Sequence, residues 1–141
     1  MRDHPRVGVM EIPSDRRVVE SPCAFVWLGD DGIMIILNKD NVEITIADHR
    51  LTYLNLRELA AGTPRPVLVD LRPIRSMDKA SRDYSASSEH MDLMSAVALL
   101  IGSPLSRVIG NFFLGLNRPR FPVKLFSDEE QARQWLRQWL P

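Results

Sequence analysis

Apolar residues form two patterns that alternate along the chain. In one they follow each other almost without interruption, and in the other they recur every three or four residues. The continuous runs cover residues 23–28, 33–37 and 96–101. Residues 67–71 are apolar except for Asp70, and the shorter stretch 123–126 is apolar except for Lys124. Runs of this length are typical of buried strands, whereas the stretches between most of them carry helical spacing. The pattern therefore predicts strands that alternate with helices, after an opening pair of strands that no helix separates.

The first two runs are predicted to pair as a β-hairpin over residues 23–38. An Asp-Asp-Gly sequence that ends at Gly32 lies between them, and glycine readily takes the positive φ that a tight turn needs. Residues 1–19 are rich in Arg, Asp and Pro, which is typical of a loose terminal arm, with an added strand near 17–20 as one option. We therefore expect a flexible arm followed by one folded domain over residues 20–141.

The first helical stretch is expected to begin at Thr45, where a T-x-x-D sequence is typical of a helix N-terminus. Its end is predicted at Gly62, because glycine caps helices and two prolines follow. His49 falls on the polar side of this helix. The predicted buried face holds four apolar residues at spacings of three and four: Ile44, Ala47, Leu51 and Leu54.

Three further helices are predicted, each behind a residue suited to cap it. Ser76 is the expected N-cap of a helix over 77–87, and Ser103 that of a helix with Pro104 in its first turn. The last helix is expected to open at the Ser127 capping box. The buried face of the helix after Ser103 is predicted to hold Leu105, Val108, Ile109, Phe112 and Leu116. That of the last helix is predicted to hold Ala132, Trp135, Leu136, Trp139 and Leu140.

Strands that alternate with helices favour an α/β fold with a mainly parallel sheet and helices on its faces. We expect about five strands, of which the N-terminal hairpin is antiparallel, and about four helices. A chain of 141 residues, of which 45% are hydrophobic, is the right size for one such domain.

Charge and cysteine content limit the partners, the location and the disulfides that we expect for this protein. The formal net charge is zero, so no overall field favours nucleic acid or anionic lipid as a partner. No stretch approaches the ~20 apolar residues of a membrane span, and the polar N-terminus lacks an apolar leader core. Cys23 is the single cysteine and lies in an apolar run, where a buried thiol is expected. We therefore expect a soluble, cytoplasmic protein without an internal disulfide.

The residues that carry common chemistry do not form a recognisable catalytic set. His4, His49 and His90 are scattered, and none has a second His or Cys at metal-ligand spacing. The chain lacks the G-x-S-x-G, G-x-G-x-x-G and P-loop sequences. Its paired acids at 30–31 and 128–130 are explained by a turn and a helix start. We therefore expect no metal, no cofactor and no enzymatic activity.

Two loops are nevertheless candidates for a binding site. In a parallel α/β sheet, the loops after the strand C-termini meet at one rim, where ligands commonly bind. Arginines and helix N-termini there suit a carboxylate or a phosphate, although the serines could equally be caps and the arginines could bridge carbonyls. The loops after the two most buried strands, with the helix start that follows, supply Arg72, Arg75, Ser76, Ser103, Ser106 and Arg107.

The helix after Ser103 has two more unusual features. Gly110 costs about 1 kcal/mol relative to alanine within a helix, so close packing against a neighbour is expected to offset it. Asn111 could then hydrogen-bond a neighbouring loop. Phe112 and Phe113 are adjacent and cannot both point to one face, so one of them is a candidate for lining a pocket or an oligomer surface.

Three stretches together resemble the STAS/SpoIIAA-like domains, which share the fold of anti-sigma-factor antagonists. They are VLVDLR (67–72), SPLSRVIGNFFLGLN (103–117) and PVKLFSDEEQARQWL (122–136), and the resemblance covers about residues 20–140. The chain is similar in particular to an uncharacterised bacterial subfamily with this fold. The resemblance implies an α/β fold and a role in protein interaction or ligand sensing, and related folds have been linked to apolar or lipid-like ligands.

The same resemblance bears on a phosphorylation switch. Antagonists of this type carry a phosphorylatable serine in an M-D-S-S-G sequence, at the start of the helix after the central strand. Here the matching residues, 77–81, read M-D-K-A-S, with Lys79 and Ala80 in place of the two serines. Ser76 and Ser81 lie nearby but out of register. The resemblance therefore implies a loop that lacks the phosphoacceptor.

These observations favour a non-enzymatic interaction module. It would bind a protein partner, or a second copy of itself as a homodimer, through the rim loops and the helix that follows Ser103. The alternative is a small-ligand domain, in which an apolar or anionic molecule lies between the rim and the helix of Phe112 and Phe113. No nucleic-acid partner is expected.

Overall fold

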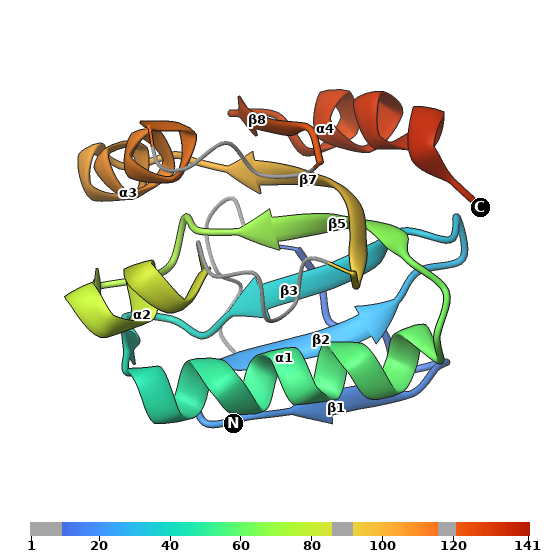
Figure 1. The fold of residues 1–141 in the computed structure, drawn as a ribbon, viewed down its shortest axis with the longest axis horizontal. Coiled ribbons are helices and arrows are strands. Elements are labelled where there is room, and N and C mark those ends of the chain that lie inside the picture. The colour runs from blue at the N-terminus through green and yellow to red at the C-terminus, as the bar shows by residue number, and fades with distance from the viewer. Residues whose placement is uncertain (1–9, 86–91, 116–120) are drawn as a thin grey trace.

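The apolar strands pair into a six-stranded sheet with the order β1-β2-β3-β5-β7-β8 (Figure 1). The computed structural model describes residues 10–85, 92–115 and 121–141. The strands are β1 (Val18–Glu20), β2 (Ala24–Leu28), β3 (Met34–Asn38), β5 (Arg65–Asp70), β7 (Met94–Leu100) and β8 (Val123–Phe126). The pairs β1–β2 and β2–β3 are antiparallel, and the other three are parallel. The predicted α/β class is thus confirmed, with β1 as a sixth strand at the edge.

Helices cover both faces of this sheet. α1 (Ile46–Ala60) packs on β1, β2 and β3, and α3 (Pro104–Gly115) packs beside β8. The short α2 (Lys79–Ser85) contacts α1. On the opposite face, α4 (Glu129–Leu136) packs on β5, β7 and β8 and continues into a 3₁₀ turn, η2 (Arg137–Trp139). Figure 1 shows α2 and α3 beyond the arrowheads of β5 and β7, so both helices begin at the same edge of the sheet.

The central strands are apolar on both faces because each face has its own core. In β3, Met34 and Ile36 belong to the core beneath α1, whereas Ile35 and Leu37 belong to the core beneath α4. Leu56 of α1 and Ile109 of α3 complete the first core. Ala132 and Leu136 of α4 complete the second core. The continuous apolar runs of the sequence are therefore explained by burial on two sides.

The predicted hairpin is present, and a small second sheet was not expected. Gly32 has a φ of +85° in the turn between β2 and β3, as the Asp-Asp-Gly sequence predicts. The second sheet consists of β4 (Glu43–Ile44) and β6 (Ser76–Met77), which pair in parallel. Strands of two residues are too short to produce a periodic pattern. Their pairing joins the loop after β5 to the start of α1.

The buried side of α1 differs from the predicted one. Leu51 and Leu54 are 44% and 59% exposed, and Ala47 is exposed as well. Ile44 is buried, but it lies in β4 before the helix. The residues that α1 does bury also follow helical spacing and are His49, Thr52, Leu56 and Ala60.

Polar side chains occupy this interface because other elements supply partners for them. The Oγ1 of Thr52 lies 2.9 Å from the Oγ of Ser21 and 3.3 Å from the sulfur of the buried Cys23. His49 packs against the rings of Tyr53 and Tyr84, at 5.0 and 5.5 Å between centroids. His49 is therefore buried, contrary to its predicted place on the polar side of the helix.

Two of the predicted helix caps were also wrong. Ser76 lies in β6, and α2 is instead capped by Asp78, whose Oδ1 accepts from the Ser81 amide at 2.7 Å. α4 is capped by Asp128 rather than Ser127, since Asp128 Oδ2 accepts from the Gln131 amide at 2.9 Å. A carboxylate suits a helix N-terminus because it accepts from free amides and faces the positive end of the dipole.

α3 approaches the sheet through small residues. A Cβ at Gly110 would lie only 2.7 Å from Cδ2 of Leu125, so the predicted close packing of this glycine is confirmed. Ile109 is buried as expected, but Leu105 and Val108 are 39% and 65% exposed, contrary to the predicted stripe. The side chains of Phe112 and Leu116, also in that stripe, lie outside the described residues.

Three expectations about the chain as a whole can be compared with the described residues. None of their helices is long and apolar enough to cross a membrane. Cys23 is buried, as expected. Residues 1–9 lie outside the described residues, so a flexible arm over 1–19 stays a prediction.

The assignment of the α1 faces predicts a contrast between two leucines. Leu56→Ala removes a fully buried side chain and is expected to lower the free energy of unfolding by about 2–5 kcal/mol. Leu54→Ala removes an exposed one and is expected to change it by less than about 0.5 kcal/mol. Urea denaturation of the two variants measures both values. Equal destabilisation would contradict the observed orientation of α1.

Candidate functional site

The loops after β5 and β7 meet at one edge of the sheet, as predicted. The Leu71 amide donates to the Leu100 carbonyl at 3.0 Å, which keeps the two strand ends side by side. A Cβ at Gly102 would lie 3.1 Å from Cγ of Arg72, so the second loop passes directly against the first. The structure thus brings Arg72 together with the loop that starts α3. We call these two loops, with the first turns of α3, the rim.

Arg72 is held by a carboxylate within the rim. Asp70, which is fully buried at the end of β5, accepts from Arg72 Nε at 2.9 Å and from Nη2 at 2.8 Å. Its Oδ1 also accepts from the Arg72 amide at 3.0 Å. The hydrogen bonds that Arg72 donates to Asp70 raise the pKa of Arg72 above its ordinary value. Arg72 therefore stabilises the loop and offers little of its guanidinium to an anion.

The serines of the second loop are engaged with each other and with the backbone. Ser103 Oγ accepts from the Ser106 amide at 3.0 Å, so its predicted role as N-cap is confirmed. The buried Ser106 Oγ accepts from the amides of Gly102 and Ser103, both at 2.9 Å, and donates to the Ser103 carbonyl at 3.0 Å. Ser106 thus closes the turn between β7 and α3 and is not a surface ligand.

The remaining predicted rim residues lie on the surface. Arg75 is exposed, and its amide donates to the carbonyl of Val42, just before β4, at 2.8 Å. Ser76 Oγ donates to Glu43 at 3.5 Å across the small sheet. Arg107 is exposed on α3. Within the described part of the chain, neither Arg75 nor Arg107 forms an ion pair, so both are available to an acidic group.

Two predictions about α3 have different outcomes. Asn111 is exposed, and no hydrogen bond joins it to a loop among the residues that the structure describes. The side chains of Phe112 and Phe113 lie outside the described residues. The proposed pocket or oligomer surface at these two phenylalanines therefore stays a prediction.

α3 carries an exposed apolar surface that the sequence pattern did not predict. Leu105 and Val108 are both exposed on the first two turns of the helix, and Arg107 lies between them in the sequence. Ser106, Ile109 and Gly110 face inward instead. Their spacing of three and four could have suggested this orientation, because small residues let a helix approach a sheet closely.

The loop that corresponds to the antagonist phosphorylation site is tightly folded. Ser81 is fully buried, and its Oγ donates to the Ile44 carbonyl at 3.2 Å. Its amide donates to Asp78, and this backbone hydrogen bond holds the pKa of Asp78 below its ordinary value of 3.8. Asp78 thus joins the start of α2 to the small sheet through Ser81.

The acidic and sulfur-bearing side chains do not converge on a metal. Among the described residues, no group of three or more His, Cys, Asp or Glu side chains could hold a metal ion. His49 packs against the rings of Tyr53 and Tyr84. His4 and His90 lie outside the described residues.

Comparison with known proteins identifies the family. A family profile described as Domain of unknown function (DUF7793) matches residues 26–140, from β2 to the turn after α4. The chain belongs to the DUF7793 family. No curated protein matches this DUF7793 chain.

Solved structures show which fold this DUF7793 protein shares. One is an uncharacterised protein of the DUF3478 family with a SpoIIAA-like fold, from Shewanella loihica PV-4. It matches with a TM-score of 0.54 at 18% identity, over 89% of this chain and 99% of that chain. A protein of unknown function from Arthrobacter sp. FB24 is 31% identical over 79% of this chain and 90% of that chain, with a TM-score of 0.31. The match to the Shewanella loihica protein shows that the fold of the DUF7793 protein is SpoIIAA-like, as its sequence resemblance implied.

The cap of α2 predicts a pH dependence near its N-terminus. Because the pKa of Asp78 is lower in the folded protein than the ordinary 3.8, the ionised carboxylate stabilises α2 above that pH. This contribution to the stability of α2 is lost as the pH falls through the Asp78 pKa of the folded protein. Carboxyl ¹³C titration by NMR is expected to give an Asp78 midpoint below 3.8.

Ser81→Ala provides the control for this titration. The backbone amide of Ser81 is the main cause of the lowered Asp78 pKa, and the Ser81 hydroxyl is the second. The substitution removes the hydroxyl and keeps the amide. The Asp78 midpoint should therefore rise without reaching the ordinary value. A wild-type midpoint at or above 3.8 would contradict the cap.

Proposed function

We propose that this DUF7793 protein is a non-enzymatic interaction module of the cytoplasm, which binds a protein partner or a second copy of itself through the rim. The observation that carries the proposal is the exposed apolar pair of α3. Leu105 and Val108 are 39% and 65% exposed on a helix whose inner side is already buried. Exposed apolar groups with charged neighbours are typical of a surface that is covered in a complex.

The charges around this pair indicate the chemistry of the partner. Arg107 lies on the exposed side of α3, between Leu105 and Val108 in the sequence, and has no carboxylate partner among the described residues. Arginine is favoured at interfaces because its planar guanidinium binds carboxylates with two hydrogen bonds while its stem packs on apolar groups. The proposed partner therefore presents apolar side chains flanked by Asp or Glu.

The polar groups of the rim favour binding over catalysis. Ser103 and Ser106 hydrogen-bond each other and the backbone, and in the described part of the chain no histidine, lysine or carboxylate activates either hydroxyl. A serine nucleophile needs such a base. Arg72 is bonded to Asp70, which weakens the alternative of an anionic small ligand at the same place.

The proposed module also differs from phosphorylated antagonists. Ser81 is the serine of the M-D-K-A-S sequence, and it is buried with its hydroxyl bonded to a carbonyl. A kinase needs an exposed hydroxyl in an accessible segment. We therefore propose that binding at the rim is not controlled by phosphate at this position.

A charge placed on α3 tests the proposal. Val108→Asp replaces one residue of the exposed pair by a carboxylate. It is expected to weaken the complex at least about tenfold, because an unpaired charge that is buried in the interface is costly. Leu54→Asp is the matched control, since it places the same charge on a similarly exposed site of α1.

Two measurements read out this pair of variants. Sedimentation equilibrium measures self-association, and quantitative affinity purification from the source cell measures partners that the wild type retains. A dimer or partner that is lost in Val108→Asp but kept in Leu54→Asp supports the proposal. A monomer whose retained partners are the same in all three proteins would refute it.

A further inference from the structure

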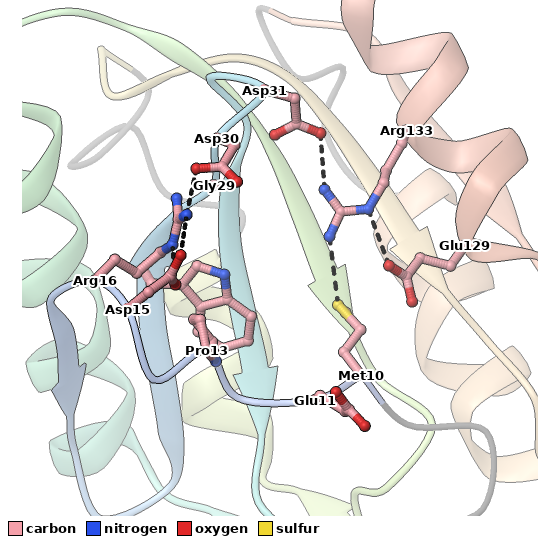
Figure 2. A pocket seen from close by; sticks show the side chains of 11 residues that line it. Met10, Glu11, Pro13, Asp15, Arg16, Gly29, Asp30, Asp31, Glu129 and Arg133 are labelled. Atoms are coloured by element: carbon pink, nitrogen blue, oxygen red, sulfur yellow. Dashed lines mark hydrogen bonds and ion pairs between the residues drawn. The ribbon is translucent and has the colours of Figure 1, made fainter.

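A cavity of about 580 Å³ opens on the α4 side of the sheet, beside the turn between β2 and β3. Figure 2 shows its two walls, with Asp15 and Arg16 on one side and Glu129 and Arg133 of α4 on the other. Its volume is within the usual range for small-molecule sites. The lining residues are Met10, Glu11, Pro13, Asp15, Arg16, Trp27, Gly29, Asp30, Asp31, Glu129 and Arg133, none of which belongs to the rim.

The walls carry an excess of negative charge that the cavity's own arginines do not neutralise. Among the described residues that line the cavity, five carboxylates face two guanidinium groups, which leaves three negative charges in excess. Arg16 binds Asp15 and Asp30, and Arg133 binds Asp31 and Glu129. Glu11 has no ion-pair partner within the described ranges. The concave shape concentrates this field in the space between the walls.

The arginines hold these carboxylates in place before any ligand arrives. Arg133 donates from Nη1 to Asp31 and from Nε to Glu129, both at 2.9 Å, and its Nη2 lies 3.9 Å from the sulfur of Met10. It thereby joins α4, the β2–β3 turn and the N-terminal segment. Arg16 in addition donates to the Leu28 carbonyl at 3.1 Å, at the end of β2. A site whose charged groups are already ordered loses little entropy on binding.

Trp27 of β2 provides an independent indication of a ligand. It lines the cavity, although only 4% of the residue is exposed. Within the described part of the chain, its indole N–H donates no hydrogen bond. A nearly buried indole normally has a hydrogen-bond partner, so an acceptor from outside the chain is expected here.

The spread of the carboxylates excludes a metal ion as that ligand. Although five acids line the cavity, no three of the described His, Cys, Asp or Glu side chains approach closely enough to hold one. A larger cation can contact carboxylates on both walls. It can also lie against an aromatic ring, to which guanidinium and ammonium groups are attracted.

We propose that this cavity binds an organic cation, a guanidinium or ammonium group on a short stem that also carries a hydrogen-bond acceptor. The cation lies between Glu11 and the carboxylates of the two walls, and the acceptor receives the Trp27 indole N–H. Such a group occurs in free small molecules and in the arginine side chain of a peptide. The site is separate from the rim, so neither proposal depends on the other.

NMR of the full chain tests this site through the indole signal of Trp27, which Trp27→Phe identifies among the three indoles. N-acetyl-L-arginine amide is the probe, and N-acetyl-L-citrulline amide is its neutral isostere, which keeps both amide carbonyl acceptors and adds a ureido oxygen. The arginine compound is expected to shift the Trp27 signal saturably, and the citrulline compound is not. The absence of a saturable shift, or an equal response to both compounds, would overturn the proposal.

A matched pair of variants locates the binding charge. Glu11→Gln removes a carboxylate of the cavity and should weaken binding of the arginine compound about fivefold. Glu130→Gln removes an exposed carboxylate of α4 that does not line the cavity and should weaken it less than about twofold. Equal affinities in both variants and the wild type would also overturn the proposal.

4-Guanidinobutan-1-ol then distinguishes the two sources of the cation. It carries the same guanidinium and a hydroxyl acceptor without the peptide groups. Tighter binding of this alcohol than of the arginine compound supports a free small molecule as the ligand, and the reverse order supports an arginine side chain of a peptide. Failure of both to bind refutes the cation site, and the rim proposal is unaffected.

Discussion

The parallel pairing of β3, β5 and β7 positions most other elements of this protein. These strands are buried on both faces, and each large apolar side chain that leaves water contributes about 1.5–3 kcal/mol. Parallel neighbours need long crossover connections, which place α1 between β3 and β5 and α2 between β5 and β7. The common direction of the strands then brings the ends of β5 and β7 to one edge, where α2 and α3 begin.

This arrangement gives the protein two surfaces with different chemistry. At the rim, the polar residues mainly hold the loops, because Asp70 binds Arg72 and Ser106 closes the turn before α3. What remains exposed there is apolar and basic. Beside the β2–β3 turn, the arginines are the residues that are used structurally, and an excess of carboxylates faces the open space. The two proposed sites therefore favour ligands of opposite charge.

The strands, the hairpin and the number of helices could be predicted because each depends on a local pattern. The orientation of the helices could not. Leu51 and Leu54 fit an apolar stripe, yet α1 buries Thr52 because Ser21 and Cys23 lie beneath it as hydrogen-bonding partners. Leu105 and Val108 fit another stripe. The close approach of Gly110 to Leu125 turns both outward.

The candidate sites follow the same division. The sequence alone determined that Arg72 and Ser103 meet at one rim, because parallel strands that end in loops must bring those loops together. It did not determine that the Arg72 guanidinium would pair with Asp70. Nor did it determine that Trp27 would line the same cavity as Glu11 and Glu129. Residues so far apart in the chain become neighbours only through the packing of α4 and the N-terminal segment on the sheet. No local pattern records such contacts, since they depend on which groups the rest of the fold brings within reach.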